Sequence, residues 1–131
     1  MKNSPKVGTT AEQTFVVGPG HVIDFAEGGM PAILSTPWLI WFLEHAARQA
    51  VLGSLEASES TVGTHIEVDH LAATPLGQTV TCRARIVHVE GPRISLQLQA
   101  RDEDEVIAKG FHKLLVIRVE RFARKVQRKA R

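Results

Sequence analysis

The chain has 131 residues, of which 44% are hydrophobic and 23% charged, as is usual for a globular protein of one domain. Its longest apolar run, residues 37–43, is too short to span a bilayer, and the first residues lack the apolar stretch of a signal peptide. We therefore expect a single cytoplasmic domain over residues 1–131, with no membrane as a partner.

The net charge of +2 conceals an asymmetry along the chain. Residues 118–131 hold seven basic residues and one acidic residue, a net +6, so the rest of the chain carries −4. This distribution speaks against a nucleic-acid surface spread over the domain, and we expect no nucleic acid as a partner. The basic tail could attract a phosphorylated cofactor such as coenzyme A, or nucleic acid, but a solvated helix face is the simpler interpretation.

The only cysteine, Cys82, excludes an intrachain disulfide, in agreement with a reducing compartment. It alternates with Val80, Ala84 and Ile86, which predicts a small buried hydrophobic side chain rather than a nucleophile.

The first part of the chain predicts extended segments and a loop. Residues 13–17 have the composition of a strand, which ends at the turn signal of residues 18–20, and residues 21–25 form a second short extended piece. Residues 26–31, rich in glycine, are expected to form a flexible loop. Because this loop leads directly into the next helix, it is placed to act as a lid or a pocket wall.

Residues 34–48 predict a helix that is apolar on almost every side, and such a helix belongs inside a protein. Thr36 is the expected N-cap, with Pro37 at the first helical position, and the helix is expected to stop at Gly53. This segment also contains Glu44. A carboxylate among apolar residues is costly unless it is paired or used in chemistry.

Strand patterns follow one another from residue 61. In the first, His70 falls on the core side with Ile66 and Val68, because side chains two apart share a face of a strand. The solvent side of this strand carries His65, Glu67 and Asp69. Further strands are expected near residues 80–86, 94–101 and 106–119, and an amphipathic helical tail over residues 121–129.

These patterns predict one long antiparallel meander, in which each strand has one apolar face. A sheet of this kind needs a cover, and the apolar helix is the only one available. We therefore expect an α+β hotdog fold, in which an antiparallel sheet wraps around one central helix and a short helical tail follows. One helix can scarcely protect the edges of so long a sheet, so we also expect a homodimer or higher homo-oligomer.

Three residues could carry chemistry. Glu44 could be a general base or orient another group, or it could form a salt bridge at a subunit interface. His70 could simply be a satisfied core histidine, but together with Glu44 it would make an acid–base pair. Thr36 could be only an N-cap, or a nucleophile close to free helix amides.

Metal and nucleotide sites have weaker support. His65, Glu67 and Asp69 could bind a metal, although a solvated strand face is the preferred interpretation. The remaining histidines show no metal-ligand spacing; they are His21, His45, His88 and His112. Phosphate-binding glycine loops and a G-x-S-x-G motif are absent from the sequence. We expect neither a metal nor a separate cofactor.

Several motifs resemble the fluoroacetyl-CoA thioesterase family of hotdog proteins. These are Thr36 with Glu44 eight positions later, Gly63-Thr64, and His70-Leu-Ala-Ala-Thr-Pro-Leu-Gly77. The segments Val89-Glu-Gly-Pro-Arg93 and Glu120-Arg-Phe-Ala-Arg-Lys-Val126 are similar as well. The resemblance extends over about residues 7–129, and the His-x-Ala-Ala-Thr-Pro-x-Gly segment is its most specific part.

The resemblance implies an acyl-CoA thioesterase in which Thr36, Glu44 and His70 form the catalytic triad. It places Gly63 at a backbone position that contacts the thioester. It also implies a dimer with coenzyme A, here part of the substrate, at the subunit interface. The loop before the helix is shorter than in the fluoroacetate-specific enzyme and offers only Phe25 to the acyl pocket, so the acyl group stays open. A hotdog hydratase or dehydratase and a non-catalytic acyl-CoA-binding module are the alternatives.

Overall fold

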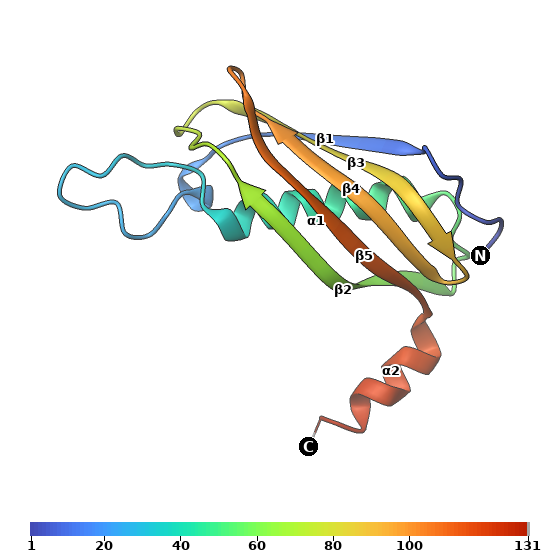
Figure 1. Ribbon diagram of the computed structural model, residues 1–131. Helices are drawn as coiled ribbons and strands as arrows, with labels where there is room; N and C mark the ends of the chain where they lie inside the picture. Colours follow the sequence, from blue (N-terminus) through green and yellow to red (C-terminus); the bar gives the residue numbers. More distant parts are fainter. Residues whose placement is uncertain (131) are drawn as a thin grey trace.

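The computed structural model describes residues 1–130 of the chain. Five strands form one antiparallel sheet that curves around a central helix, and a second helix extends from the end of the sheet (Figure 1). In chain order the elements are β1 (Thr10–Val16), the 3₁₀ turn η1 (Pro19–His21), α1 (Thr36–Leu52), β2 (Glu59–His70), β3 (Thr79–Glu90), β4 (Arg93–Arg101), β5 (Val106–Arg118) and α2 (Val119–Gln127).

The strand order is β1-β3-β4-β5-β2, so the expectation of one continuous meander is wrong. Only β3, β4 and β5 follow one another as neighbours, whereas β2 pairs with β5 and β1 pairs with β3. The helix α1 explains this order because it joins β1 to β2 and crosses the concave face of the sheet between them (Figure 1). The two strands therefore lie at opposite edges of the sheet.

The core lies between α1 and the inner face of the sheet. The inward residues of β3 and β4 alternate with outward ones and are almost completely buried, as Ile86 and Leu96 illustrate. They pack with Leu39 and Leu43 of α1 in one hydrophobic cluster. The expected α+β arrangement of a sheet curved around one helix is confirmed.

The helix α1 is not buried on every side as its composition predicts. Its buried residues lie on the side facing the sheet, but Trp38 and Trp41 are 38% and 46% exposed. The difference arises because the sheet covers only one side of the helix. Within residues 1–130, no helix is long and apolar enough to cross a membrane.

Candidate active site

The N-terminus of α1 and the C-terminus of β2 meet at Thr36 and His70. A hydrogen bond of 2.8 Å joins Oγ1 of Thr36 to Nδ1 of His70. The predicted inward face of β2 is confirmed by the burial pattern, in which Ile66, Val68 and His70 are each partly buried between exposed neighbours. Two residues separated by 34 positions are thereby brought into contact by the crossing of α1 over the sheet.

Ser35, and not Thr36, is the N-cap of α1, which corrects the expectation from the sequence. Ser35 has an extended backbone, its carbonyl accepts the first helical bond from the amide of Leu39, and its Oγ accepts from the amide of Trp38 at 3.4 Å. Both oxygens of Ser35 thus take the capping roles. Thr36 is the first helical residue and Pro37 the second, so the hydroxyl of Thr36 is left to bind His70.

The second ring nitrogen of His70 lacks a hydrogen-bond partner in the part of the chain that the structure describes. Nε2 is buried and makes no hydrogen bond to any atom of residues 1–130. Burial lowers the pKa of His70 below its ordinary value, and the nearby backbone of Ala72 opposes this in part. A histidine that is neutral near pH 7 and bonded to a hydroxyl is suited to act as a general base.

Glu44 lies more than two turns further along α1, about 12 Å from Thr36 in the direction of the axis. Its carboxylate adjoins Gly63 of β2 and the ring of His112 of β5, where Gly63 leaves open the space that a side chain would fill. A Cβ atom at Gly63 would lie 3.6 Å from Oε2 of Glu44 and 3.1 Å from Cε1 of His112. Gly63 also stands at a register shift between β2 and β5.

A small cavity of about 60 Å³ opens beside these groups and is also lined by Arg48 and Thr61. It is large enough for a water molecule or one oxygen of a substrate. Arg48 itself donates hydrogen bonds to the hydroxyls of Ser60 and Thr61, both at 3.2 Å, which fixes α1 against β2 at this point.

His112 is a feature of the site that the sequence analysis missed. Its side chain is 2% exposed, and Nδ1 donates to the carbonyl oxygen of His65 at 2.9 Å. Burial lowers the pKa of His112, whereas the bond to His65 and the charge of Glu44 raise it. The available signal was its alternation with Leu114 and Val116, which predicts an inward position on the last strand.

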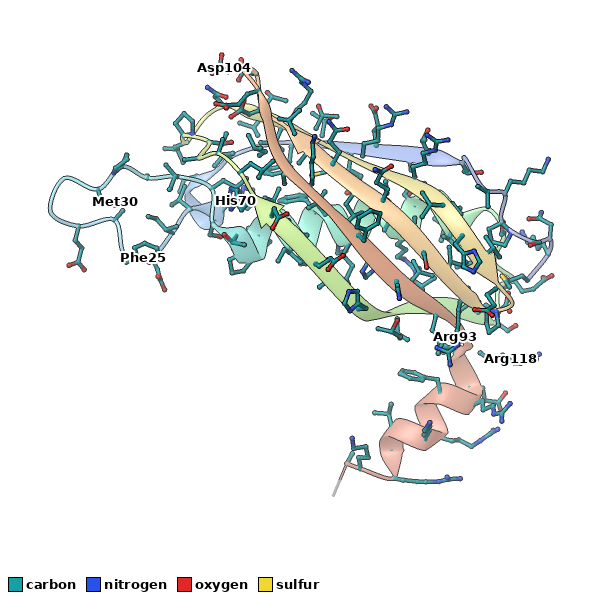
Figure 2. The ribbon with its side chains drawn as sticks, in the orientation of Figure 1. Phe25, Met30, His70, Arg93, Asp104 and Arg118 are labelled. Carbon is teal, nitrogen blue, oxygen red and sulfur yellow. The ribbon has the colours of Figure 1, made fainter. Side chains whose placement is uncertain are left out.

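The structure therefore arranges the predicted residues in two groups. Thr36 and His70 are in contact, while Glu44 lies beside Gly63 and His112 instead of His70. Phe25, the expected residue of the acyl pocket, is 62% exposed in the loop before α1. Figure 2 shows this loop, with Phe25 and Met30 labelled, extending away from the sheet and from His70.

Other candidate groups have structural explanations. Cys82 is fully buried, and burial raises the pKa of its thiol to about 12, so the prediction of a buried hydrophobic side chain is confirmed. His65, Glu67 and Asp69 face solvent, as expected. Among residues 1–130 there is no group of three or more His, Cys, Asp or Glu side chains that could hold a metal ion.

Comparison with solved structures defines the class of this fold. The chain superposes on a Thermus thermophilus protein described as a thioesterase superfamily member with a TM-score of 0.90, at 26% identity, over 99% of this chain and 96% of the other. It also superposes on a hot-dog-like protein from Thermanaerovibrio acidaminovorans with a TM-score of 0.85, at 24% identity, over 94% and 91% of the two chains. The fold is thus the hotdog fold of thioesterases.

A closer relationship follows from sequence. The model of the fluoroacetyl-CoA-specific thioesterase family matches residues 17–120. The fluoroacetyl-CoA thioesterase of Streptantibioticus cattleyicolor is 36% identical over 98% of this chain and 97% of the relative. A solved structure of fluoroacetyl-CoA thioesterase superposes with a TM-score of 0.89 at 36% identity, over 97% of this chain and 98% of the other. This protein belongs to the fluoroacetyl-CoA-specific thioesterase family, and the prediction of a thioester hydrolase is confirmed.

Proposed function

We propose that this protein hydrolyses a small acyl-CoA thioester, using Thr36, His70 and Glu44. The observation that carries the proposal is the hydrogen bond between Thr36 and His70, whose second ring nitrogen is buried without a hydrogen-bond partner among residues 1–130. A hydroxyl next to a neutral imidazole is the arrangement that activates a nucleophile. The names of the relatives, which are thioesterases for a coenzyme A ester, support the same class of substrate.

In the first step, the hydroxyl of Thr36 gives its proton to Nδ1 of His70 and its oxygen attacks the thioester carbonyl. The negative charge that develops on the carbonyl oxygen is stabilised by a backbone amide, either at the start of α1 or at Gly63. The imidazolium of His70 then returns the proton to the leaving thiolate of coenzyme A, which leaves the acyl group esterified to Thr36. A water molecule that gives its proton to Glu44 or to His70 then attacks this ester, and the carboxylic acid leaves as the oxygen of Thr36 takes the proton back. A second route uses the same groups, with Thr36 positioning a water molecule that attacks directly.

Glu44 and Gly63 are expected to complete this site across a subunit interface. The strand β2 has 12 residues and lies at the edge of the sheet, so its free side can pair with β2 of a second copy. Antiparallel pairing centred between Ile66 and Glu67 would place His70 of one chain opposite Gly63 of the other. The thioester would then lie between the Thr36–His70 pair of one protomer and the Glu44 cavity of its partner.

Release of free thiol from a panel of acyl-CoA esters tests this function. Acetyl-, fluoroacetyl-, propionyl- and longer acyl-CoA esters, compared at equal concentration, identify the acyl group that gives the highest kcat/KM. We expect a short acyl group to be preferred. Hydration of an enoyl-CoA ester without thiol release, or tight binding of acyl-CoA without turnover, would contradict the proposal.

Variants at the three residues test the mechanism. We expect Glu44→Gln and His70→Ala to lower kcat by about 10² to 10⁴ on the preferred ester, the usual loss for a general acid or base. An acyl group that remains attached to Thr36, detected by mass spectrometry in Glu44→Gln, would distinguish the covalent route from direct attack by water. Wild-type rates in both variants would refute these assignments.

A further inference from the structure

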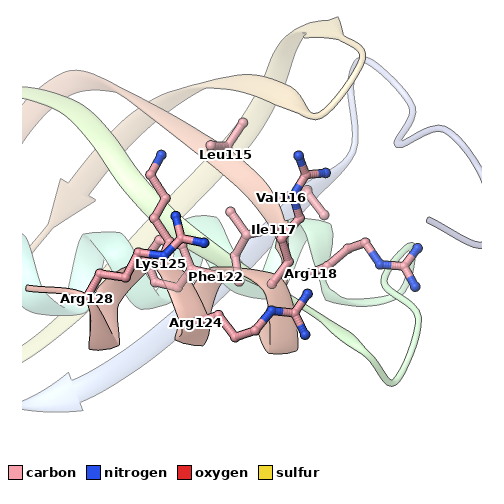
Figure 3. Close-up of a pocket in the computed structure, with 9 residues that line it drawn as sticks. Leu115, Val116, Ile117, Arg118, Phe122, Arg124, Lys125 and Arg128 are labelled. Atoms are coloured by element: carbon pink, nitrogen blue, oxygen red, sulfur yellow. The ribbon is translucent and has the colours of Figure 1, made fainter.

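A groove between α2 and the end of β5 has features that the proposed catalytic residues do not use. Its volume is about 650 Å³, far larger than the cavity beside Glu44 and within the range of roughly 300–1,000 Å³ typical of ligand sites. Figure 3 shows that basic side chains from both elements surround an apolar floor that includes Phe122. The basic residues are Arg118, Arg121, Arg124, Lys125 and Arg128.

Two of these cations have acidic neighbours within the chain. Arg124 forms an ion pair of 2.9 Å with Glu120, and Arg118 lies opposite Glu59 in the β2–β5 ladder. Arg121, Lys125 and Arg128 form no salt bridge with any side chain of residues 1–130.

The spacing of the three unpaired cations is unfavourable without a bound anion. Residues 121, 125 and 128 follow each other at intervals of four and three, so they share one face of α2. Like charges at this spacing destabilise a helix, and the cost is removed if an anion binds between them. The groove therefore has the chemistry of a polyanion site, with an aromatic ring among the cations that could stack on a base.

The proposed substrate carries such a polyanion at the end remote from its thioester. Coenzyme A ends in an adenosine that bears a 3′-phosphate and a pyrophosphate, joined to the thiol by a long pantetheine arm. Leu114 of β5 lines the cavity beside Glu44, and Arg118 lies four residues further along the same strand, roughly 13 Å away. The strand β5 thus runs from the proposed thioester site to the groove.

We propose that the α2–β5 groove binds the phosphorylated adenosine end of the coenzyme A substrate, chiefly through Arg121, Lys125 and Arg128. This inference rests on the proposed function for its substrate. It assigns a role to the basic tail and separates recognition of the nucleotide from the chemistry at Thr36 and His70.

The test compares two substrates and two triple variants. One substrate is the preferred acyl-CoA, and the other is the same acyl group on N-acetylcysteamine, which has no nucleotide. The first variant is Arg121→Gln with Lys125→Gln and Arg128→Gln. The matched control, Arg83→Gln with Arg85→Gln and Lys109→Gln, removes the same charge from a hollow on the outer face of the sheet.

We expect the α2 variant to raise KM for the acyl-CoA about tenfold and to leave kcat/KM for the N-acetylcysteamine ester unchanged, since three exposed ion pairs are lost. The control variant should leave both values unchanged. An unchanged KM for the acyl-CoA in the α2 variant would overturn the proposal. An equal rise of this KM in both variants would also overturn it, because it would indicate only long-range attraction between the substrate and the protein's positive charge.

Direct binding separates this proposal from the proposed function. Calorimetric titration of 3′-phospho-ADP into the intact protein needs no turnover, and we expect binding that the α2 variant weakens about tenfold and the control does not. Failure to bind 3′-phospho-ADP would overturn the proposal even if thioesters are hydrolysed. If the α2 variant changes the oligomeric state and loses activity on both substrates, the groove is a subunit contact and the proposal is wrong.

Discussion

The two groups of candidate catalytic residues on α1 are organised in different ways. At the start of the helix, Thr36 and His70 are held by a direct hydrogen bond between side chains. More than two turns further on, Glu44 stands in a space that Gly63 leaves open and that His112 bounds. The first group depends on a contact and the second on the absence of a side chain. Substitutions should therefore disturb the two groups by different physical means.

The largest effect on kcat is expected when the hydrogen bond between Thr36 and His70 is removed. Thr36→Val keeps the shape of the side chain but removes the hydroxyl, and should lower kcat on the preferred acyl-CoA by about 10² to 10⁴. Thr36→Ser restores the hydroxyl and should recover much of the rate. Thiol release measures both variants, and circular dichroism checks that α1 is intact. Full activity in Thr36→Val would show that the hydrogen bond to His70 has no catalytic role.

The open space beside Glu44 is tested by filling it. The backbone of Gly63 has no positive φ, so alanine suits its conformation. The new Cβ would crowd Cε1 of His112 at 3.1 Å and fill the space up to van der Waals contact with Oε2 of Glu44 at 3.6 Å. We expect Gly63→Ala to fold and to lose about 10² in kcat/KM, the cost of a small displacement of catalytic groups. Gly53→Ala is the matched control, since a Cβ there meets nothing within 4 Å. Equal activities in the two variants would contradict the role of this space.

The difference between the two groups also explains what the sequence could predict. The alternation of β2 predicts an inward His70, and the composition of residues 34–48 predicts the helix that carries Thr36 and Glu44. The pairing of β2 with β5 was not predictable from local patterns, because it depends on how α1 crosses the sheet. Alternation along β5 predicts an inward His112, but only this pairing places it beside Gly63 and Glu44, so its membership of the site was missed.

A substitution in the segment after His70 could weaken the hydrogen bond between Thr36 and His70 without removing either side chain. Thr74 is fully buried, its hydroxyl donates to Oδ2 of Asp102 at 2.9 Å, and its carbonyl accepts from the amide of Leu34, two residues before Thr36. It thus ties the segment that follows His70 to the segment that precedes Thr36.

Thr74→Val should lower the free energy of unfolding by about 1–3 kcal/mol, because Asp102 loses a buried donor. A fall in kcat is also expected. If the two groups are independent, kcat falls by the same factor in Gly63→Ala and in wild type, and a different factor would show that they are coupled. Urea titration and thiol release measure these effects. Thr81→Val on the outer side of β3 is the control, and an equal loss of stability there would remove the special role of Thr74.

The smallest effect expected is on the pH dependence of stability and activity, which compares His70 with His112 directly. Burial lowers the pKa of both His70 and His112 in the folded protein. As the pH falls below about 6.5, the unfolded chain binds protons that these folded side chains do not, so stability is present above that pH and is lost as the pH falls further. The urea midpoint should therefore decrease between about pH 7.5 and about pH 5. His112→Gln should reduce this decrease, whereas His88→Gln, at an exposed position, should leave it unchanged.

The pH dependence of activity should follow His70 alone, because kcat/KM needs the neutral form of this residue. The decline of kcat/KM should therefore begin below the ordinary pKa of histidine, in wild type and in His112→Gln alike. A shift of the activity profile in His112→Gln would show instead that the two groups titrate as one site.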